Sequence, residues 1–180
     1  MAPVLGVIIG SVRTGRVGPT VAQWFVRRAS ADGRFEVRVL DLADVVLPMD
    51  LSGGPGVDEL TRWVDGCDAF VLVTPEYNHG CPASLKLALD SVKLEWRGKP
   101  VGFVSYGGTA GGVRAVEQLR LVVAELHMAS VRDAVLFPRV KKAFDAHGET
   151  SDGAAIDGAK RMIDQLLWWS ERAGQPYPRG

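Results

Sequence analysis

The sequence predicts a single α/β domain in which helices cover both faces of a parallel β-sheet. Short apolar runs alternate with helical patterns along the chain, as expected of repeated strand–helix units. Three of these runs are almost continuously apolar, which is typical of strands buried on both faces. A length of 180 residues fits one domain, so we expect residues 1–180 to form a single unit.

Five segments are candidate strands, at residues 4–9, 35–41, 69–74, 101–105 and 131–137. The second segment differs from the others because Phe35, Val37 and Val39 alternate with charged residues, a pattern that suits an edge strand. The strand order 2-1-3-4-5 places this segment at an edge of the sheet. We therefore predict a flavodoxin-like three-layer sandwich with a five-stranded parallel sheet of order 2-1-3-4-5.

Five helical patterns follow the strands, and each carries an apolar stripe at the spacing of an amphipathic helix. The stripes are Val17, Val21, Trp24 and Phe25; Leu60, Val64 and Cys67; Leu85, Ala88, Leu89 and Val92; Val116, Leu119, Val123 and Leu126; and Ile156, Ala159, Ile163, Leu166 and Leu167. In such a fold, ligands bind beyond the carboxyl ends of the strands, near the switch point between the first and third strands. The loops after the first, third and fourth strands are therefore the candidates for function.

Composition narrows the class of protein. The chain has 21 basic and 21 acidic residues, so it carries no overall charge that would favour nucleic acid or an anionic membrane. Its two cysteines, Cys67 and Cys81, form no metal-type pair and no disulfide scaffold, and we expect no metal site. We find neither a secretory leader nor an apolar stretch of membrane-spanning length, which predicts a cytoplasmic protein.

The loop after the first strand has the residues of a phosphate site. Pro19 is expected in the first turn of the next helix, and free N–H groups at a helix N-terminus bind anions. Ser11 and Thr14 add hydroxyl donors, and Arg13 and Arg16 add guanidinium groups that match phosphate oxygens. The loop has neither G-x-G-x-x-G nor the lysine of a P-loop, which favours a monophosphate. A plain loop with two solvated arginines is the alternative.

The loops after the third and fourth strands are also unusual. Residues 75–82 are polar, rich in turn formers and bounded by prolines, so their backbone is constrained. Such a loop can direct N–H groups at a planar heterocycle, with Tyr77 as an apolar face, although a structural turn is the alternative. Residues 107–112 contain four glycines, which suits close approach of the backbone to a ligand.

Together the three loops resemble a known family. The segments G-S-V-R-T-G-R, P-E-Y-N-H-G-x-P-x-x-L-K-x-A-L-D and S-Y-G-G-T-A-G-G-x-R-A occur in this order, as in the NAD(P)H-dependent FMN reductases. That family has the flavodoxin-like fold and includes reductases of quinones, azo dyes and metal oxyanions. One departure is Arg16, where many members have a small hydroxyl residue.

The resemblance implies a set of FMN-binding residues. It places the phosphate of FMN against Ser11, Arg13 and Arg16. It places the isoalloxazine ring against Pro75, Glu76, Tyr77 and Asn78, and its pyrimidine end beside Ser105, Tyr106, Gly107 and Gly108. Arg114 either meets a phosphate of the nicotinamide donor or anchors its helix to a neighbour.

We therefore expect an FMN-dependent oxidoreductase that moves hydride from NADPH or NADH to FMN and on to a small acceptor. Quinones, azo compounds, metal oxyanions and free flavin are the candidate acceptors. The cofactor carries the hydride chemistry, so no catalytic side chain is expected, and no triad motif is visible. The alternative is a flavodoxin-type electron carrier or an FMN-binding module without nicotinamide turnover, but carriers usually have a strongly acidic surface.

The third and fourth helical patterns predict a homodimer or a dimer of dimers. Their apolar residues extend beyond one stripe of about 100°. The residues concerned are Leu85, Leu87, Ala88, Leu89, Val92 and Leu94, then Val113, Val116, Leu119, Leu121, Val122 and Ala124. A two-fold interface would cover the excess, and Trp96 would then help to wall the partner's pocket. The alternative is that these residues pack within a monomer.

Overall fold

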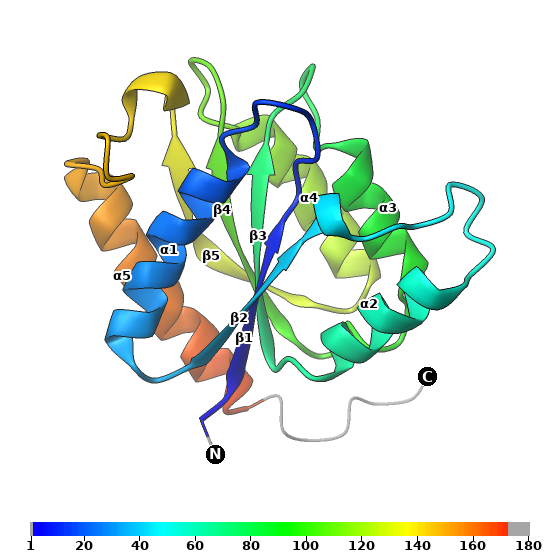
Figure 1. Ribbon diagram of the computed structural model, residues 1–180. Coiled ribbons are helices and arrows are strands. Elements are labelled where there is room, and N and C mark those ends of the chain that lie inside the picture. The colour runs from blue at the N-terminus through cyan, green and yellow to red at the C-terminus, as the bar shows by residue number, and fades with distance from the viewer. Residues whose placement is uncertain (1, 173–180) are drawn as a thin grey trace.

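The computed structural model describes residues 2–172, with a five-stranded parallel sheet at the centre (Figure 1). The strands are β1 (Val4–Ile9), β2 (Glu36–Asp41), β3 (Ala69–Pro75), β4 (Pro100–Tyr106) and β5 (Ala129–Phe137). Their order is β2-β1-β3-β4-β5, and every neighbouring pair is parallel. The flavodoxin-like order predicted from the sequence is confirmed, including the edge position of the alternating strand.

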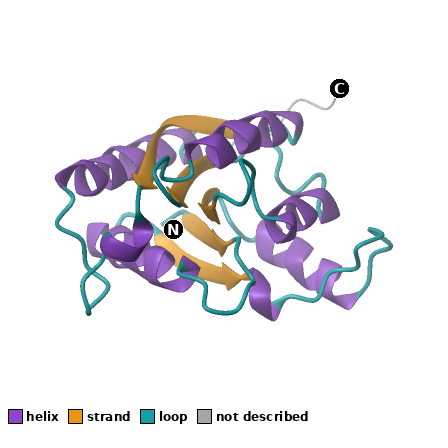
Figure 2. Cartoon of the chain, turned by 90° about the horizontal axis from the view of Figure 1, so that it is seen from above, coloured by secondary structure: helices purple, strands orange, loops and turns teal. Residues whose placement is uncertain are grey.

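Helices cover both faces of this sheet, as the view from above shows (Figure 2). They are α1 (Gly18–Asp32), α2 (Pro55–Asp65), α3 (Ala83–Ser91), α4 (Val113–Glu125) and α5 (Gly153–Ser170), with short 3-10 turns η1 (Leu42–Asp44) and η2 (Val140–Lys142). Helices α1 and α5 pack on one face, and α2, α3 and α4 pack on the other. The molecule is therefore a three-layer sandwich.

The apolar runs form two cores because successive side chains of a strand point to opposite faces. In β3, Val71 and Val73 pack against α1 and α5, whereas Phe70 and Leu72 pack against the helices of the other face. All seven residues of β3 and of β4 are buried. This double burial explains why these runs are almost continuously apolar.

Local signals set the ends of the helices. Pro19 lies in the first turn of α1, as predicted, and Gly33 ends that helix with a left-handed φ of 76°. The Asp152 side chain accepts hydrogen bonds from the N–H groups of Ala154 and Ala155 and so caps α5.

Trp96 does not lie where the dimer hypothesis placed it. Its side chain is fully buried and packs edge-to-face on Phe70 of the same chain, with ring centroids 4.9 Å apart. Helix α3 ends at Ser91, and Trp96 packs in the core between the sheet and helices α2, α3 and α4. The expectation that Trp96 walls a partner's pocket is therefore wrong.

Within residues 2–172, no helix is long and apolar enough to cross a membrane. In the same range, no three His, Cys, Asp or Glu side chains gather in a way that would hold a metal ion. Residue 1 and residues 173–180 of the expected single unit lie outside the described residues.

Candidate functional site

The three loops singled out in the sequence meet at one edge of the sheet. Because all five strands are parallel, their carboxyl ends lie together at the top of Figure 1. The loop after β1, the loops after β3 and β4, and the connection after β5 all emerge there. This edge is where open α/β sheets bind their ligands.

The loop after β1 is anchored at its base and open at its tip. Gly10 donates its N–H to the carbonyl of Val73 at 2.8 Å, and the Ser84 hydroxyl donates to the carbonyl of Gly10 at 2.6 Å. Within the described chain, the N–H groups of residues 12–15 donate no hydrogen bond. These free donors precede the N-terminus of α1, so the loop has the features of an anion site.

The two arginines of this loop are in different states. Arg16 is held by Asp41, with nitrogen–oxygen distances of 2.5 and 2.7 Å, and it donates a third bond to the Ser11 carbonyl at 2.7 Å. Arg13 is exposed, makes no ion pair with a described residue, and lies 5.6 Å from the centroid of the Tyr77 ring. Arg13 is thus free to meet an anion, whereas Arg16 ties the loop to the end of β2. Thr14 is exposed at the tip.

Arg16 and Asp41 stabilise each other's charged forms. Burial alone would raise the pKa of Asp41, but hydrogen bonds from Arg16 and from the N–H of Ala43 outweigh it, so the pKa lies below its ordinary value. The hydrogen bond with Asp41 raises the pKa of Arg16. Asp41 was not predicted from the sequence, although its place at the carboxyl end of β2 could have indicated it.

Four predicted site residues are buried, namely Ser11, Pro75, Ser105 and Tyr106. The Tyr106 hydroxyl donates to the Ser11 hydroxyl at 3.0 Å, and the Ser105 hydroxyl donates to the Gly111 carbonyl at 2.8 Å. Burial raises the pKa of Tyr106 to about 12, although its hydrogen bond to Ser11 acts in the opposite direction. These side chains therefore hold the loops together from inside the fold.

The loop after β3 forms a tight turn. Tyr77 and Gly80 exchange two backbone hydrogen bonds of 2.9 and 3.1 Å. The two residues between them, Asn78 and His79, have φ values of 47° and 75°, as in a type I′ turn. Asn tolerates this left-handed conformation better than most residues, which explains why it stands at the first of the two positions.

Contacts with α4 fix this turn from the side. The Arg114 guanidinium lies 2.5 Å from the Glu76 carboxylate, which also accepts the Arg114 N–H at 3.2 Å. The side-chain oxygen of Gln118 accepts the N–H of Cys81 at 3.2 Å. Arg114 thus anchors α4 to the neighbouring loop, one of the two roles that the sequence left open. No sequence motif indicates this role of Gln118.

The glycine loop after β4 is joined to the connection after β5. Arg139 donates its N–H to the Gly108 carbonyl at 2.7 Å, and Val140 donates to the Gly107 carbonyl at 3.1 Å. A side chain at Gly112, where φ is 90°, would lie 2.8 Å from the Cβ of Ser105. Gly107 and Gly108 line a cavity of about 360 Å³ together with residues 139–142.

The fold is that of the flavodoxin-like proteins, and the loops after β1, β3 and β4 meet at the edge where such sheets bind their ligands. Residues 3–142 match the family model described as NADPH-dependent FMN reductase, so the chain belongs to that family. The resemblance inferred from the three motifs is confirmed, as is the enzyme class.

Individual relatives agree. The chain is 42% identical over 154 residues to an NAD(P)H-dependent FMN reductase of Schizosaccharomyces pombe, covering 78% of this chain and 76% of the relative. It is 29% identical over 138 residues to an NADPH:quinone oxidoreductase of Arabidopsis thaliana, covering 73% and 70%. The solved structure of the flavoenzyme NAD(P)H:(acceptor) oxidoreductase FerB from Paracoccus denitrificans shares the fold, with a TM-score of 0.75 at 22% identity over 96% of this chain and 100% of that one.

Proposed function

We propose that this FMN reductase binds FMN along the carboxyl edge of the sheet, with the phosphate in the loop after β1. The observation that carries the proposal is the set of free N–H groups at residues 12–15, next to the unpaired guanidinium of Arg13. A phosphate group is the ligand that such donors match. Thr14 adds a hydroxyl at the tip, and Ser11 and Arg16 hold the loop in shape.

The same proposal places the flavin ring between the loops after β3 and β4. Residues 75–78 lead into the tight turn at Tyr77–Gly80, whose left-handed residues and contacts with α4 hold it in place. On the other side, the main chain of residues 105–108 is held by β5, and the N–H of Gly108 donates no hydrogen bond within the described residues. A planar heterocycle with carbonyl oxygens fits this pair of walls.

FMN supplies the hydride chemistry when it is bound, taking a hydride from the nicotinamide donor and giving it to the acceptor. The chain's own residues bind and orient. Arg13 would meet the phosphate, Tyr77 would offer an apolar face, and the ion pair of Glu76 and Arg114 would keep the two loops at a fixed separation. No side chain is needed as an acid or a base for the hydride step.

For the acceptor, we propose a small oxidised compound such as a quinone. The support is the Arabidopsis thaliana relative, whose name is NADPH:quinone oxidoreductase. A metal oxyanion, an azo dye or free flavin would use the same edge. For the donor we propose NADPH in preference to NADH.

The test is a spectrum followed by turnover. The purified protein should show the absorbance of an oxidised flavin, and heat denaturation should release FMN and no FAD. It should then oxidise NADPH continuously when a quinone is supplied. A protein that binds no flavin, even when FMN is added, contradicts the proposal. Flavin retention without NADPH oxidation would instead support an electron carrier.

A further inference from the structure

A cluster of positive charge lies at the end of β5, outside the residues assigned to FMN. We call Arg139, Lys141 and Lys142, with Val140 between them, the basic segment. Its three cations are exposed, and none forms an ion pair or a side-chain hydrogen bond with another described residue. The chain as a whole has no net charge, so three unpaired cations within four residues form a strong local field.

The basic segment is fixed against the proposed flavin site. Two backbone hydrogen bonds join it to the carbonyls of Gly107 and Gly108, at 3.1 and 2.7 Å. Those glycines and the basic segment line the same cavity of about 360 Å³. A group bound there would be in contact with the loop proposed for the pyrimidine end of the flavin.

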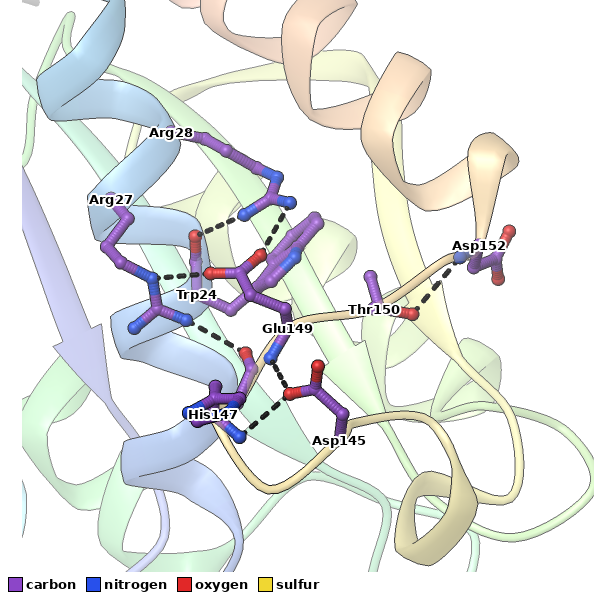
Figure 3. Close-up of polar contacts among 9 residues, drawn as sticks. Trp24, Arg27, Arg28, Asp145, His147, Glu149, Thr150 and Asp152 are labelled. Atoms are coloured by element: carbon purple, nitrogen blue, oxygen red, sulfur yellow. Dashed lines mark hydrogen bonds and ion pairs between the residues drawn. The ribbon is translucent and has the colours of Figure 1, made fainter.

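The rest of the connection is clamped to α1 (Figure 3). Glu149 accepts hydrogen bonds from Arg27 at 2.7 Å and from Arg28 at 2.9 Å. The Gly148 carbonyl accepts a further bond from Arg27 at 2.8 Å, and Asp145 closes the turn by accepting the N–H of Glu149 at 2.8 Å. The basic segment is therefore held on both sides, by the glycine loop before it and by this clamp after it.

The phosphate of FMN cannot serve both anion sites. The phosphate loop follows β1 and the basic segment follows β5, with β3 and β4 between them. Strands in a sheet lie about 4.8 Å apart, so three spacings separate the two sites by roughly 14 Å. FMN carries one phosphate, so an anion bound at the basic segment would come from another molecule.

We infer that the basic segment binds the 2′-phosphate on the adenosine half of NADPH and so selects this donor over NADH. The inference rests on the proposed function, because it requires the nicotinamide to lie at the flavin. With its nicotinamide there, the donor must extend its adenosine half away from the ring, and the basic segment lines the cavity beside Gly107 and Gly108. Lysine and arginine are the side chains that pair with a phosphate. Arg114, paired with Glu76, is not required for this role.

The test measures binding of two nucleotides that lack nicotinamide, 2′,5′-ADP and 5′-AMP, by calorimetry on the FMN-loaded protein. The variant Lys141→Ala/Lys142→Ala removes two charges of the segment. The matched control Lys93→Ala/Lys160→Ala removes two exposed lysines elsewhere in the chain. We expect the first variant to bind 2′,5′-ADP at least tenfold more weakly, with unchanged affinity for 5′-AMP, and the control to behave like the native protein.

Each other outcome has a definite meaning. If the variant loses affinity equally for both nucleotides, or loses none for 2′,5′-ADP, the inference is wrong. The proposed function still stands in that case, provided that the variant retains FMN. If the protein never retains FMN, the proposed function itself is wrong. A third arm uses NADH as donor and compares a sulfonated azo dye with a neutral quinone. If only the KM for the dye rises in the first variant, the segment binds the acceptor, and the assignment to the donor is wrong.

Discussion

The hydroxyl of Tyr106 donates a hydrogen bond of 3.0 Å to the hydroxyl of Ser11, and both residues are buried. The bond joins the carboxyl end of β4 to the loop after β1, which are separated in the sheet by β3. It therefore couples the proposed ring-binding loop to the proposed phosphate loop. A change at either residue should alter both the stability of the fold and the binding of FMN.

Tyr106→Phe removes this hydrogen bond and leaves the Ser11 hydroxyl without its partner. We expect the free energy of unfolding at neutral pH to fall by about 1–3 kcal/mol. Tyr77→Phe is the control, because no hydrogen bond of the Tyr77 hydroxyl to another described residue is present. Urea denaturation of both variants measures the effect, and equal stability of the two would contradict the coupling.

The same residue gives a prediction for alkaline pH. Burial raises the pKa of Tyr106 to about 12 in the folded protein, compared with about 10 for an unperturbed tyrosine. A raised pKa means that folding favours the protonated form, so this stabilisation is complete below about pH 10 and is lost as the pH rises toward 12. The loss of stability in this range should be smaller in Tyr106→Phe than in the native protein.

Gly18 should tolerate no side chain, although it opens a helix where alanine is normally favourable. A Cβ at Gly18 would lie 2.3 Å from the Ser11 hydroxyl and 2.9 Å from that of Tyr106. Gly153 opens α5 in the same way, but nothing lies within 4 Å of its Cβ position. We expect Gly18→Ala to destabilise the fold by about 1–3 kcal/mol and to weaken FMN binding.

Gly153→Ala is the matched control for that substitution. It should be neutral or stabilise the protein by up to about 1 kcal/mol, because alanine loses less backbone entropy on folding than glycine does. Thermal melts of the two variants, with and without FMN, distinguish the cases. If the two alanines had the same effect, the close packing of Ser11 on Gly18 would have no energetic importance.

The two arginines of the phosphate loop should differ in what their replacement by alanine changes. Arg13→Ala removes the free guanidinium, so FMN affinity should fall about tenfold to a hundredfold while the apoprotein keeps its stability. Arg16→Ala leaves the Asp41 carboxylate half-buried without its partner, so the apoprotein should lose roughly 1–2 kcal/mol. Fluorescence titration with FMN and denaturation of the apoprotein measure the two effects. Unchanged FMN affinity in Arg13→Ala would remove this residue from the proposed site.

The fold was predictable because strands that are buried on both faces have a recognisable apolar pattern in the sequence. A strand such as β3, which contributes to both cores, is apolar at almost every position, whereas β2 at the edge alternates. Parallel strands then require that the loops of interest share one edge, so the regions of the site followed from the topology.

The partners of individual side chains were not predictable in the same way. Arg13 and Arg16 are identical in type and three residues apart, yet only Arg16 meets a carboxylate, because β2 ends beside it with Asp41. Likewise, the sequence predicts Trp96 beside a partner's pocket, but its side chain is buried against Phe70 of the same chain. Such contacts depend on how distant segments pack, and no local pattern encodes them.

The last prediction concerns assembly. Leu121 on α4 and Leu94 after α3 are 76% and 61% exposed, and both belong to the excess apolar residues from which we predict a homodimer. Burial of such side chains in an interface stabilises association by about 25 cal/mol per Å² of apolar surface. We expect light scattering to give at least twice the chain mass of 19.4 kDa. Leu121→Lys should shift the protein toward the monomer, whereas Ile156→Lys, an equally drastic change at an exposed position on α5, should not. A native protein that is a fully active monomer at micromolar concentration would mean that these leucines are simply solvated.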